Sequence, residues 1–444
     1  MRALIVSYVF PPVGGAGVQR VLKLVKYLPS WGVTPAVLTA HNPSAPLVDG
    51  SLEREVPPAT SVIRARTFEP RYAKKQLAWQ VTASSSQTVI SQAKRALLRA
   101  CRGLLVPDPQ VLWLPAAQLA LARRLASAEA DDVVMISGPP FSAFLLAAVA
   151  RLRPGTALVL DYRDEWTTTS SAYEMGSSGH ASALLERAVL RCAHAVTTAT
   201  EEFRGALLSR FSWLDPERVI TIPNGYDPED FPAELPTPPS DRCLLTYAGT
   251  VFRLTSARGL IEGLRLLRER EPQLAQLLET RFIGRIVDTE LDYFAGSSAL
   301  GVRQLGYLEH QAALEQLALS HATLCILDQV DGVQRIYPAK IFELMRLGRP
   351  CLALSPEGAL AQLVRRHRLG EVVAPRDPAA IASALSQLVC RFRDGSLPPV
   401  SEPLDIERFD RRLQARRFAD VFRAARASAS KRRGAARVLE SRLP

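Results

Sequence analysis

Short apolar runs alternate with amphipathic segments along most of this 444-residue chain. Apolar runs such as Ala3–Ser7 and Val133–Ser137 have the length of buried strands. Between them, apolar residues recur at helical spacing, for example over Val18–Leu28 and Pro115–Ala126. This alternation predicts an α/β fold with doubly wound parallel sheets. The other elements predicted in this half are strands Pro35–Thr39, Ala157–Asp161 and Ala195–Thr198 and a helix over Ala181–Ala193.

A proline-rich segment, Asp230–Arg242, interrupts the alternation, which then begins again. We therefore predict two Rossmann-like domains facing a central cleft. The expected parts are a first domain over 1–235, a second over 243–405, a helix over 406–427 that packs back toward the first domain, and a basic flexible tail over 428–444. The second domain is expected to contain strands Leu244–Ala248, Arg281–Ile283, Val302–Gln304, Leu324–Leu327, Cys351–Leu354 and Glu371–Val373. Its expected helices are Gly259–Arg268, Gln311–Ala318, Lys340–Leu347, Gly358–Val364 and Pro378–Arg391.

Composition and charge narrow the class of protein. A hydrophobic content of 47% with 22% charged residues is typical of a globular chain, and the net charge of +11 favours anionic partners. The six cysteines are scattered without a C-x-x-C pair, so neither a zinc site nor a disulfide framework is indicated and a reducing cytoplasm is expected. No apolar run reaches the eighteen or so residues of a membrane-spanning helix, and the first run is too short for a signal peptide.

Residues 68–107 form a distinct basic segment, in which lysine and arginine alternate with leucine, alanine and tryptophan. This composition is typical of an amphipathic insertion that lies on an anionic membrane. A solvated helix pair over the first domain explains it equally well.

The segment Tyr337–Pro350 predicts one short helix with defined ends. Pro338 pre-sets the first turn, and Gly348 suits the left-handed position after the last one. The apolar residues of the helix recur at helical spacing and are expected to face the core. They are Ile341, Leu344 and Leu347.

Lys340 and Glu343 share a different face of that helix, because they lie three residues apart. A lysine in the first turn opposes the helix dipole, whereas a phosphate bound at the helix N-terminus would explain it. Glu343 would then accept hydrogen bonds from sugar hydroxyls, as a nucleotide diphosphate requires. An ordinary capped helix with a surface ion pair explains the same two residues.

A glycine-rich turn, Gly14–Gly17, follows the first strand and would let a ligand approach the backbone at a helix start. Arg20 stands where the third glycine of the dinucleotide fingerprint would fall, and no P-loop signature is present. A nicotinamide or ATP enzyme is therefore disfavoured. A glycine-eased turn between strand and helix is the alternative.

Asp161–Trp166 places four ionisable groups at the carboxyl end of a buried strand, where open α/β sheets bind ligands. We expect Arg163 to pair with Asp161, which leaves Asp164 directed to the cleft. A purely structural network is the alternative.

The start of the second domain offers groups for phosphates at successive strand ends. Gly249 and Thr250 form a glycine turn, and Arg253, Arg258 and Arg285 follow this strand and the next. Arginine suits phosphate oxygens because its guanidinium donates in a bidentate fork. Any one of these arginines could be an ordinary surface residue. Only their convergence at successive strand ends indicates a phosphate site.

In this order, the motifs resemble those of retaining glycosyltransferases of GT-B fold, of the large family described as family 4-like or group 1 glycosyltransferases. The resemblance rests on Gly14–Gly17, Ser137–Ser142, Asp161–Trp166, Ile222–Asp227, Tyr247–Thr250 and the helix over Tyr337–Pro350. It implies that the second domain binds a nucleotide-diphosphate sugar and the first an acceptor. It also implies that no metal or other cofactor is needed, since positive side chains and helix dipoles stabilise the departing diphosphate.

The resemblance also implies roles for individual residues. Glu343 matches the second glutamate of an E-x7-E motif that holds the ribose, while the first falls on Arg335. Thr250 takes a place often held by arginine, for which Arg253 is the expected substitute. The expected catalytic residues are Asp164, Arg253 and Lys340. The donor is expected to contact Gly249, Thr250, Arg258, Arg285, Tyr337, Lys340 and Glu343, and the acceptor loop to comprise Gly14, Gly15, Gly17, Arg163 and Asp164.

The predicted function is transfer, with retention, of a hexose or related sugar to a glycan or lipid-linked acceptor in cell-surface polysaccharide or glycolipid biosynthesis. The expected location is the cytoplasm or the inner face of the membrane, with no nucleic acid partner. Two alternatives stay open. A nucleotide-sugar 2-epimerase shares the fold, but its proton transfers need acids and histidines, and Asp161, Asp164 and Glu165 are the obvious ones here. A non-catalytic nucleotide-sugar-binding or scaffold protein is the other.

Overall fold

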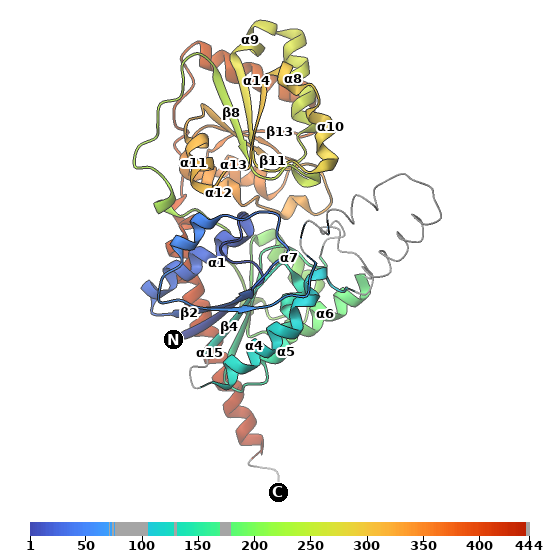
Figure 1. Ribbon diagram of the computed structural model, residues 1–444, viewed down its shortest axis with the longest axis vertical. Coiled ribbons are helices and arrows are strands. Elements are labelled where there is room, and N and C mark those ends of the chain that lie inside the picture. The colour runs from blue at the N-terminus through green and yellow to red at the C-terminus, as the bar shows by residue number, and fades with distance from the viewer. Residues whose placement is uncertain (71, 73–74, 76–104, 128–130, 169–178, 441–444) are drawn as a thin grey trace, which may run out of the picture. The chain divides into compact units, whose positions relative to one another are not determined.

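Two parallel β-sheets, each covered by helices on both faces, organise the chain (Figure 1). A computed structural model describes residues 1–70, 72, 75, 105–127, 131–168 and 179–440. Unit 1 comprises residues 1–223 and 412–444, and unit 2 comprises residues 224–411. The two Rossmann-like domains expected from the sequence are confirmed. Most of the predicted basic insertion over 68–107 lies outside the described residues.

The sheet of unit 1 has seven parallel strands in the order β3-β2-β1-β4-β5-β6-β7. The strands are β1 (Arg2–Ser7), β2 (Thr34–Ala40), β3 (Ser61–Ala65), β4 (Val133–Gly138), β5 (Ala157–Tyr162), β6 (Ala195–Thr198) and β7 (Val219–Thr221). Five of them match the predicted strands. The two edge strands, β3 and β7, were missed because β3 has an exposed arginine and serine and β7 has only three residues.

Alternate residues of the strands build two separate cores, one on each face of this sheet. Leu4 and Val6 pack under α4 (Leu114–Ala126), α5 (Ala147–Ala150), α6 (Gly179–Cys192) and α7 (Glu201–Arg210). Ala3 and Ile5 point the other way, toward α1 (Ala16–Tyr27) and α15 (Arg411–Glu440). The chain returns to unit 1 through α15, whose Phe418 and Phe422 are buried in this second core. Residues 428–440, expected as part of a mobile tail, continue this helix.

Unit 2 has six parallel strands in the order β10-β9-β8-β11-β12-β13. They are β8 (Cys243–Ala248), β9 (Leu278–Ile283), β10 (Val302–Gly306), β11 (Ala322–Ile326), β12 (Cys351–Leu354) and β13 (Gly370–Val373). One face is covered by α8 (Arg258–Arg270), α9 (Pro272–Leu277), α10 (Leu291–Phe294) and α14 (Pro378–Arg393). The other is covered by α11 (His310–Ala318), α12 (Lys340–Leu347) and α13 (Ala359–Arg366).

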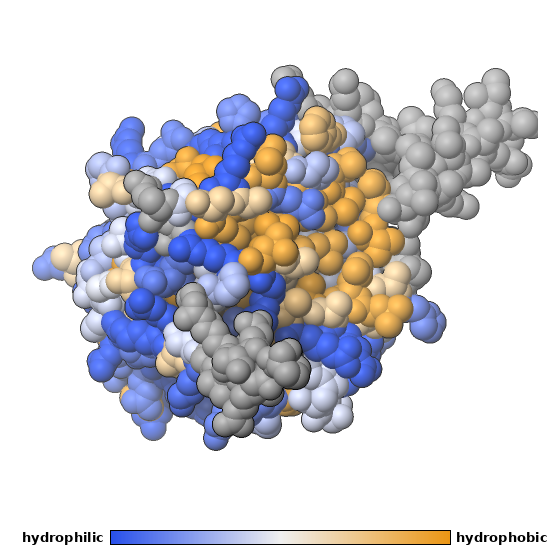
Figure 2. Space-filling view, turned by 90° about the horizontal axis from the view of Figure 1, so that it is seen from below, coloured by the Kyte–Doolittle hydropathy of each residue, from blue (hydrophilic) through white to orange (hydrophobic). Residues whose placement is uncertain are grey.

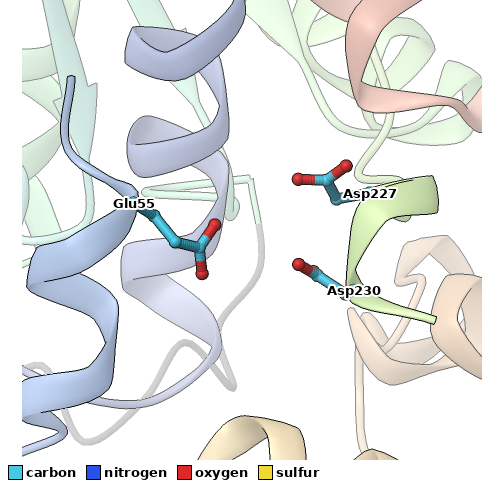
Figure 3. A group of neighbouring side chains, drawn as sticks. All are labelled: Glu55, Asp227 and Asp230. Atoms are coloured by element: carbon cyan, nitrogen blue, oxygen red, sulfur yellow. The ribbon is translucent and has the colours of Figure 1, made fainter. Parts of the chain in front are cut away.

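Entry to and exit from unit 2 are paired through the backbone. The Tyr226 N–H donates to the Phe409 carbonyl at 3.1 Å. The Arg411 N–H donates to the Tyr226 carbonyl at 2.9 Å. Both aromatic side chains are buried in the core of unit 2. The turn η6 (Pro228–Asp230) follows, where Figure 3 shows Asp227 and Asp230. Residues 224–235, expected in the first domain, thus pack within unit 2.

The Glu186 carboxylate of α6 is fully buried in unit 1. The Thr167 hydroxyl donates to one of its oxygens, and the other accepts no hydrogen bond from the described residues. Burial is the largest effect and raises the pKa of Glu186 to about 7, although Thr167 and Arg210 oppose it. The folded state therefore keeps a proton that the unfolded chain releases near its usual pKa of about 4.3.

Replacing Glu186 with glutamine is expected to stabilise the protein at pH 8. A raised folded pKa means that the native state binds more protons than the unfolded state between about pH 4 and pH 7, so stability falls as the pH rises through that window. The variant lacks this pH dependence. The difference in free energy of unfolding between the variant and the wild type should therefore be about 2–3 kcal/mol more favourable to the variant at pH 8 than at pH 4. Urea unfolding at both pH values measures this, with the exposed Glu217→Gln as control; parallel pH profiles for Glu186→Gln and wild type would contradict it.

Candidate functional site

In unit 2, the loops after neighbouring strands β8 and β9 are held together by two glycines. The Gly249 N–H donates to the Ile283 carbonyl at 2.8 Å, and Gly249 has a φ of +155°. A Cβ on Gly284 would lie 2.2 Å from the Gly249 carbonyl oxygen, so only glycine allows this approach. The Thr250 carbonyl accepts from the Tyr247 hydroxyl at 3.0 Å, which fixes the predicted glycine turn. The Val251 N–H likewise donates to the Arg285 carbonyl at 2.8 Å.

A polar cavity of about 400 Å³ opens beside this turn. Arg253, an exposed residue of η7 (Arg253–Thr255), and Arg258, the first residue of α8, both line it. The Arg258 Nε lies 3.0 Å from the Glu262 carboxylate, and its guanidinium stands 5.8 Å from the centre of the Tyr293 ring. The sequence did not indicate Arg376, which joins the cavity wall and pairs with Asp328 at 2.9 Å.

Helix α12 begins and ends as the sequence predicted. It runs from Lys340 to Leu347, and Gly348 takes a left-handed conformation with φ of 68° after its last turn. The apolar positions that were expected to face the core are at most 3% exposed. They are Ile341, Leu344 and Leu347. Tyr337, predicted to contact the donor, packs edge-on against Phe342 with ring centres 6.0 Å apart.

Glu343 lies between two basic side chains. The Lys340 Nζ is 3.2 Å from its Oε2, and the His310 Nε2 is 3.0 Å from its Oε1. Burial alone would raise the pKa of Glu343, but the charges of Lys340 and His310 outweigh it and hold that pKa well below its usual range. The contact between Lys340 and Glu343 Oε2 is an ion pair without an aligned hydrogen bond. Within the described part of the chain, this buried oxygen accepts no hydrogen bond. This oxygen therefore keeps the capacity to accept a hydrogen bond from a ligand hydroxyl.

The predicted donor residues thus fall into two groups in unit 2. Arg253 and Arg258 line the cavity, whereas Lys340, Glu343 and Arg285 are not among its lining residues. Because all six strands are parallel, the loops that follow β8, β9 and β11 emerge at the same edge of the sheet. The strand order of the sheet reverses between β8 and β11, and α/β sheets bind ligands at such a point. His310 was missed by the sequence analysis. Its position as the first residue of a helix after β10 is the same signal that singled out Lys340.

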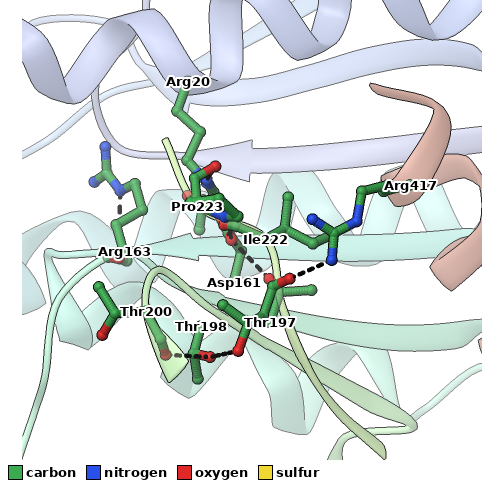
Figure 4. A network of polar contacts seen from close by, with 12 residues as sticks. Arg20, Asp161, Arg163, Thr197, Thr198, Thr200, Ile222, Pro223 and Arg417 are labelled. Atoms are coloured by element: carbon green, nitrogen blue, oxygen red, sulfur yellow. Dashed lines mark hydrogen bonds and ion pairs between the residues drawn. The ribbon is translucent and has the colours of Figure 1, made fainter. Parts of the chain in front are cut away.

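In unit 1, the buried partner of Asp161 is Arg20, which corrects the prediction that Arg163 would pair with it (Figure 4). The Arg20 Nη2 lies 2.8 Å from Asp161 Oδ1, and both side chains are at most 2% exposed. The Ser137 and Thr197 hydroxyls also donate to this carboxylate, at 2.8 and 2.7 Å. Burial raises the pKa of Asp161, but the charge and hydrogen bonds of Arg20 outweigh it and the net pKa is lowered. The two residues form a structural pair rather than a ligand site.

Arg163 instead ties together two loops at the carboxyl edge of this sheet. Its guanidinium donates to the carbonyls of Gly17, Gly138 and Pro139. Gly15 precedes α1 with a φ of +99°, and the Gly14 N–H donates to the Leu47 carbonyl at 3.1 Å. That N–H is therefore engaged by the segment that follows β2.

Asp164 follows β5 and is half-buried beside Arg163. Burial raises its pKa, while the charge of Arg163 opposes the rise. It accepts no hydrogen bond from the residues that the structure describes, which leaves its carboxylate available at the edge where the glycine turn also lies.

Two family models match consecutive parts of the sequence. The first, described as a Glycosyl transferase 4-like domain, matches residues 14–225, and the second, Glycosyl transferases group 1, matches residues 244–391. The junction between them falls in the proline-rich segment. No curated protein matches the chain by sequence.

Solved structures share the fold over nearly the whole chain. Anabaena Alr3699/HepE, solved with UDP and glucose, is 14% identical with a TM-score of 0.61, over 96% of this chain and 100% of that one. Sucrose-phosphate synthase from Thermosynechococcus elongatus is 14% identical with a TM-score of 0.55, over 100% of both chains. A mutant of S. aureus TarM, solved with Fondaparinux, alpha-GlcNAc-glycerol and UDP, is 10% identical with a TM-score of 0.56, over 95% of this chain and 99% of that one.

Proposed function

We propose that this chain, which belongs to the glycosyltransferases of GT-B fold, transfers a sugar from a nucleotide-diphosphate sugar to a glycan or lipid-linked acceptor. The observation that carries the proposal is the arrangement on α12. Glu343 there is held ionised between His310 and Lys340, and its buried Oε2, 3.2 Å from the Lys340 ammonium, accepts no aligned hydrogen bond from the described residues. A ribose hydroxyl could donate to that oxygen, and a phosphate would suit the lysine and the positive end of the helix dipole.

The departing diphosphate needs positive charge rather than a proton donor. We assign this charge to Arg253 of the short turn η7 and to Arg258 and Lys340, the first residues of α8 and α12. Donors fixed before the reaction stabilise the developing charge without reorganisation, which is the largest catalytic effect in many enzymes. We infer that the reaction proceeds with retention, without a covalent nucleophile and without a metal ion, and that EDTA leaves the rate unchanged.

The acceptor is assigned to unit 1, at the edge formed by the glycine turn, Arg163 and Asp164. Asp164, with a raised pKa and no hydrogen bond among the described residues, is suited to accept one from an acceptor hydroxyl. The glycan and UDP in the TarM structure and the UDP and glucose in the Anabaena structure support this pair of substrate classes. Biosynthesis of a cell-surface polysaccharide or glycolipid, in the cytoplasm or at the inner membrane face, is the proposed setting.

Purified protein incubated with a panel of nucleotide sugars, with and without a lipid extract, tests the function. Acceptor-dependent release of a nucleoside diphosphate, together with retained anomeric configuration in the product, is the expected result. A structure called a putative UDP-N-acetylglucosamine 2-epimerase from Listeria monocytogenes also shares the fold, at 12% identity and a TM-score of 0.53. Isomerised free donor would therefore favour an epimerase, and binding without turnover would favour a scaffold; either result would overturn the proposal.

Replacing His310 with glutamine is expected to raise KM for the donor about fivefold to tenfold with a smaller change in kcat. The substitution removes the imidazole that holds Glu343 Oε1 at 3.0 Å, so the ribose acceptor is less well oriented, whereas the groups around the phosphates stay. Steady-state kinetics measure both constants. The control is His321→Gln, because His321 accepts from the backbone N–H of Leu244 away from this helix. An unchanged KM in His310→Gln would remove His310 from the donor site.

A further inference from the structure

Arg376 is a basic side chain of unit 2 that no motif of the sequence indicated. It follows β13 and lines the polar cavity together with Arg253 and Arg258. Exposure by itself singles out no arginine of this chain, because exposed charged side chains are ordinary. Figure 2 shows hydrophilic side chains over much of one face of the molecule, and among the described residues no helix is long and apolar enough to span a membrane. What distinguishes Arg376 is the way in which its guanidinium is held.

The loop that follows β11 fixes the Arg376 guanidinium. Its Nε and Nη2 lie 2.9 and 3.2 Å from the two carboxylate oxygens of Asp328, and Nη2 also donates to the Gln329 carbonyl at 2.8 Å. A guanidinium has five N–H donors, and these contacts use the donors of Nε and Nη2. The two N–H groups of Nη1 have no acceptor among the described residues, so they are free to donate to a ligand in the cavity.

Backbone contacts bring Arg376 beside the other arginines of the cavity. A Cβ on Gly259 would lie 2.0 Å from the Pro375 carbonyl oxygen, so the first turn of α8 approaches the β13 loop only because residue 259 is glycine. The Asp328 N–H donates to the Leu254 carbonyl at 2.7 Å, which ties the β11 loop to η7. Loops that follow three different strands thus converge on this cavity.

The three carboxylates that line the cavity are already engaged. The contacts are Arg376–Asp328, Arg258–Glu262 and Ser256–Glu290, at 2.9, 3.0 and 2.6 Å. Arg253 pairs with no carboxylate in the part of the chain that the structure describes. Asp328 raises the pKa of Arg376, and the nearby charge of Arg258 opposes that rise. An anion between these guanidinium groups would relieve their repulsion, whereas a cation would have to displace an arginine from its carboxylate.

We propose that Arg376 is a further phosphate-binding residue of the donor site, in which Asp328 positions the guanidinium and Nη1 donates to a diphosphate oxygen. Arginine suits this role because its planar fork presents several donors to phosphate oxygens at once. The inference rests on the proposed function, since a nucleotide-diphosphate sugar supplies the diphosphate. It adds a residue from the loop after β13, which lies outside the motifs that carry the family resemblance.

Calorimetric titration of the full chain with inorganic pyrophosphate, and with UDP, GDP and ADP in turn, tests this role. The wild type is expected to bind pyrophosphate and at least one of the nucleotides. Arg376→Gln should weaken both about tenfold, because a charge-assisted hydrogen bond is lost, and Arg376→Lys should weaken them less. The matched control is Arg365→Gln. Arg365 is also exposed and makes a two-bond contact with Glu357, at 2.8 and 2.6 Å, but does not line the cavity, so this variant should bind like the wild type.

A double variant separates contact with the phosphate from neutralisation of Asp328. Arg376→Gln leaves the Asp328 carboxylate unpaired, and that negative charge by itself repels an anion. Arg376→Gln/Asp328→Asn removes both charges, so the net charge of the cavity is the same as in the wild type. It should still bind pyrophosphate about fivefold more weakly than the wild type, because the donors of Nη1 are gone. Thermal unfolding checks that the variants fold.

Three results would overturn the proposal. They are a wild type that binds neither pyrophosphate nor any of the three nucleotides, an Arg376→Gln variant that binds like the wild type, and full recovery of affinity in the double variant. Sugar transfer is measured separately, so the two proposals fail in different ways. Transfer by the wild type with unchanged affinity in Arg376→Gln would remove only Arg376 from the donor site. Binding that depends on Arg376 without transfer would support this role and contradict the proposed transfer.

Discussion

Glu343→Gln is expected to lower kcat/KM for the nucleotide sugar by roughly 100-fold. The substitution keeps the volume of the side chain and removes its negative charge, so a donor hydroxyl loses a charge-assisted hydrogen bond. Such a bond contributes about 1.5–3 kcal/mol, or roughly 10- to 150-fold in affinity. Lys340→Met is expected to cause a loss of similar size, because it removes the charge that neutralises Glu343 and that we propose binds the donor phosphate. Calorimetric titration of the nucleoside diphosphate measures binding directly, and initial rates measure turnover.

The matched control for these variants is Glu269→Gln, an exposed carboxylate near the end of α8. It changes the same charge at a surface position and should leave both binding and rate within about twofold of the wild type. Thermal unfolding in parallel separates a loss of the site from a loss of the fold. Wild-type donor affinity in both Glu343→Gln and Lys340→Met would contradict the site assignment, whatever the overall activity of the protein.

Arg20→Met is expected to destabilise unit 1 by about 3–5 kcal/mol, the cost of leaving one partner of a buried ion pair alone. The substitution leaves the Asp161 carboxylate without its counterion. It also leaves the carbonyls of Ile222 and Pro223, which now accept at 2.9 and 3.0 Å, without a donor. The loss should shrink as the pH falls from 7 toward 4, because burial without Arg20 raises the pKa of Asp161, which then takes a proton and is no longer a buried charge. Urea unfolding at pH 7 and pH 4 measures both effects.

Two further variants test whether this cost is electrostatic. Arg20→Met/Asp161→Leu removes both charges and should be less destabilised than Arg20→Met alone, since an apolar pair can replace a buried ion pair. Arg426→Met removes an arginine of α15 that is 52% exposed and pairs with Asp132, and should cost at most about 1 kcal/mol. Equal stability of Arg20→Met and Arg426→Met would show that the buried pair is not a structural element.

Much of the fold follows from patterns that are local in the chain. The predicted strands of unit 1 and the ends of α12 agree with the structure, because hydrophobic periodicity, Pro338 and Gly348 act within a few residues. The edge strands β3 and β7 escaped the same reasoning. They are short or half-polar, and they form only because a neighbouring strand offers hydrogen bonds to them.

The candidate site shows the same division between local and long-range information. Lys340 and Glu343 were found together because they are three residues apart on one helix. His310, which completes their contact, is 33 positions from Glu343 and follows a different strand. The sequence also suggested Arg163 as the partner of Asp161, two residues away, although side chains two apart on a strand end need not meet.

The sequence by itself therefore determined the class of fold, the helix that carries the candidate donor residues, and the basic groups at successive strand ends. Only the tertiary structure decided which of these side chains meet. It paired Asp161 with Arg20, 141 positions away, because β1 and its following helix pack beside the strands β4 and β5. It also placed Arg253 and Arg258 in one cavity. Such meetings depend on crossover connections between parallel strands, and no local pattern of residues encodes them.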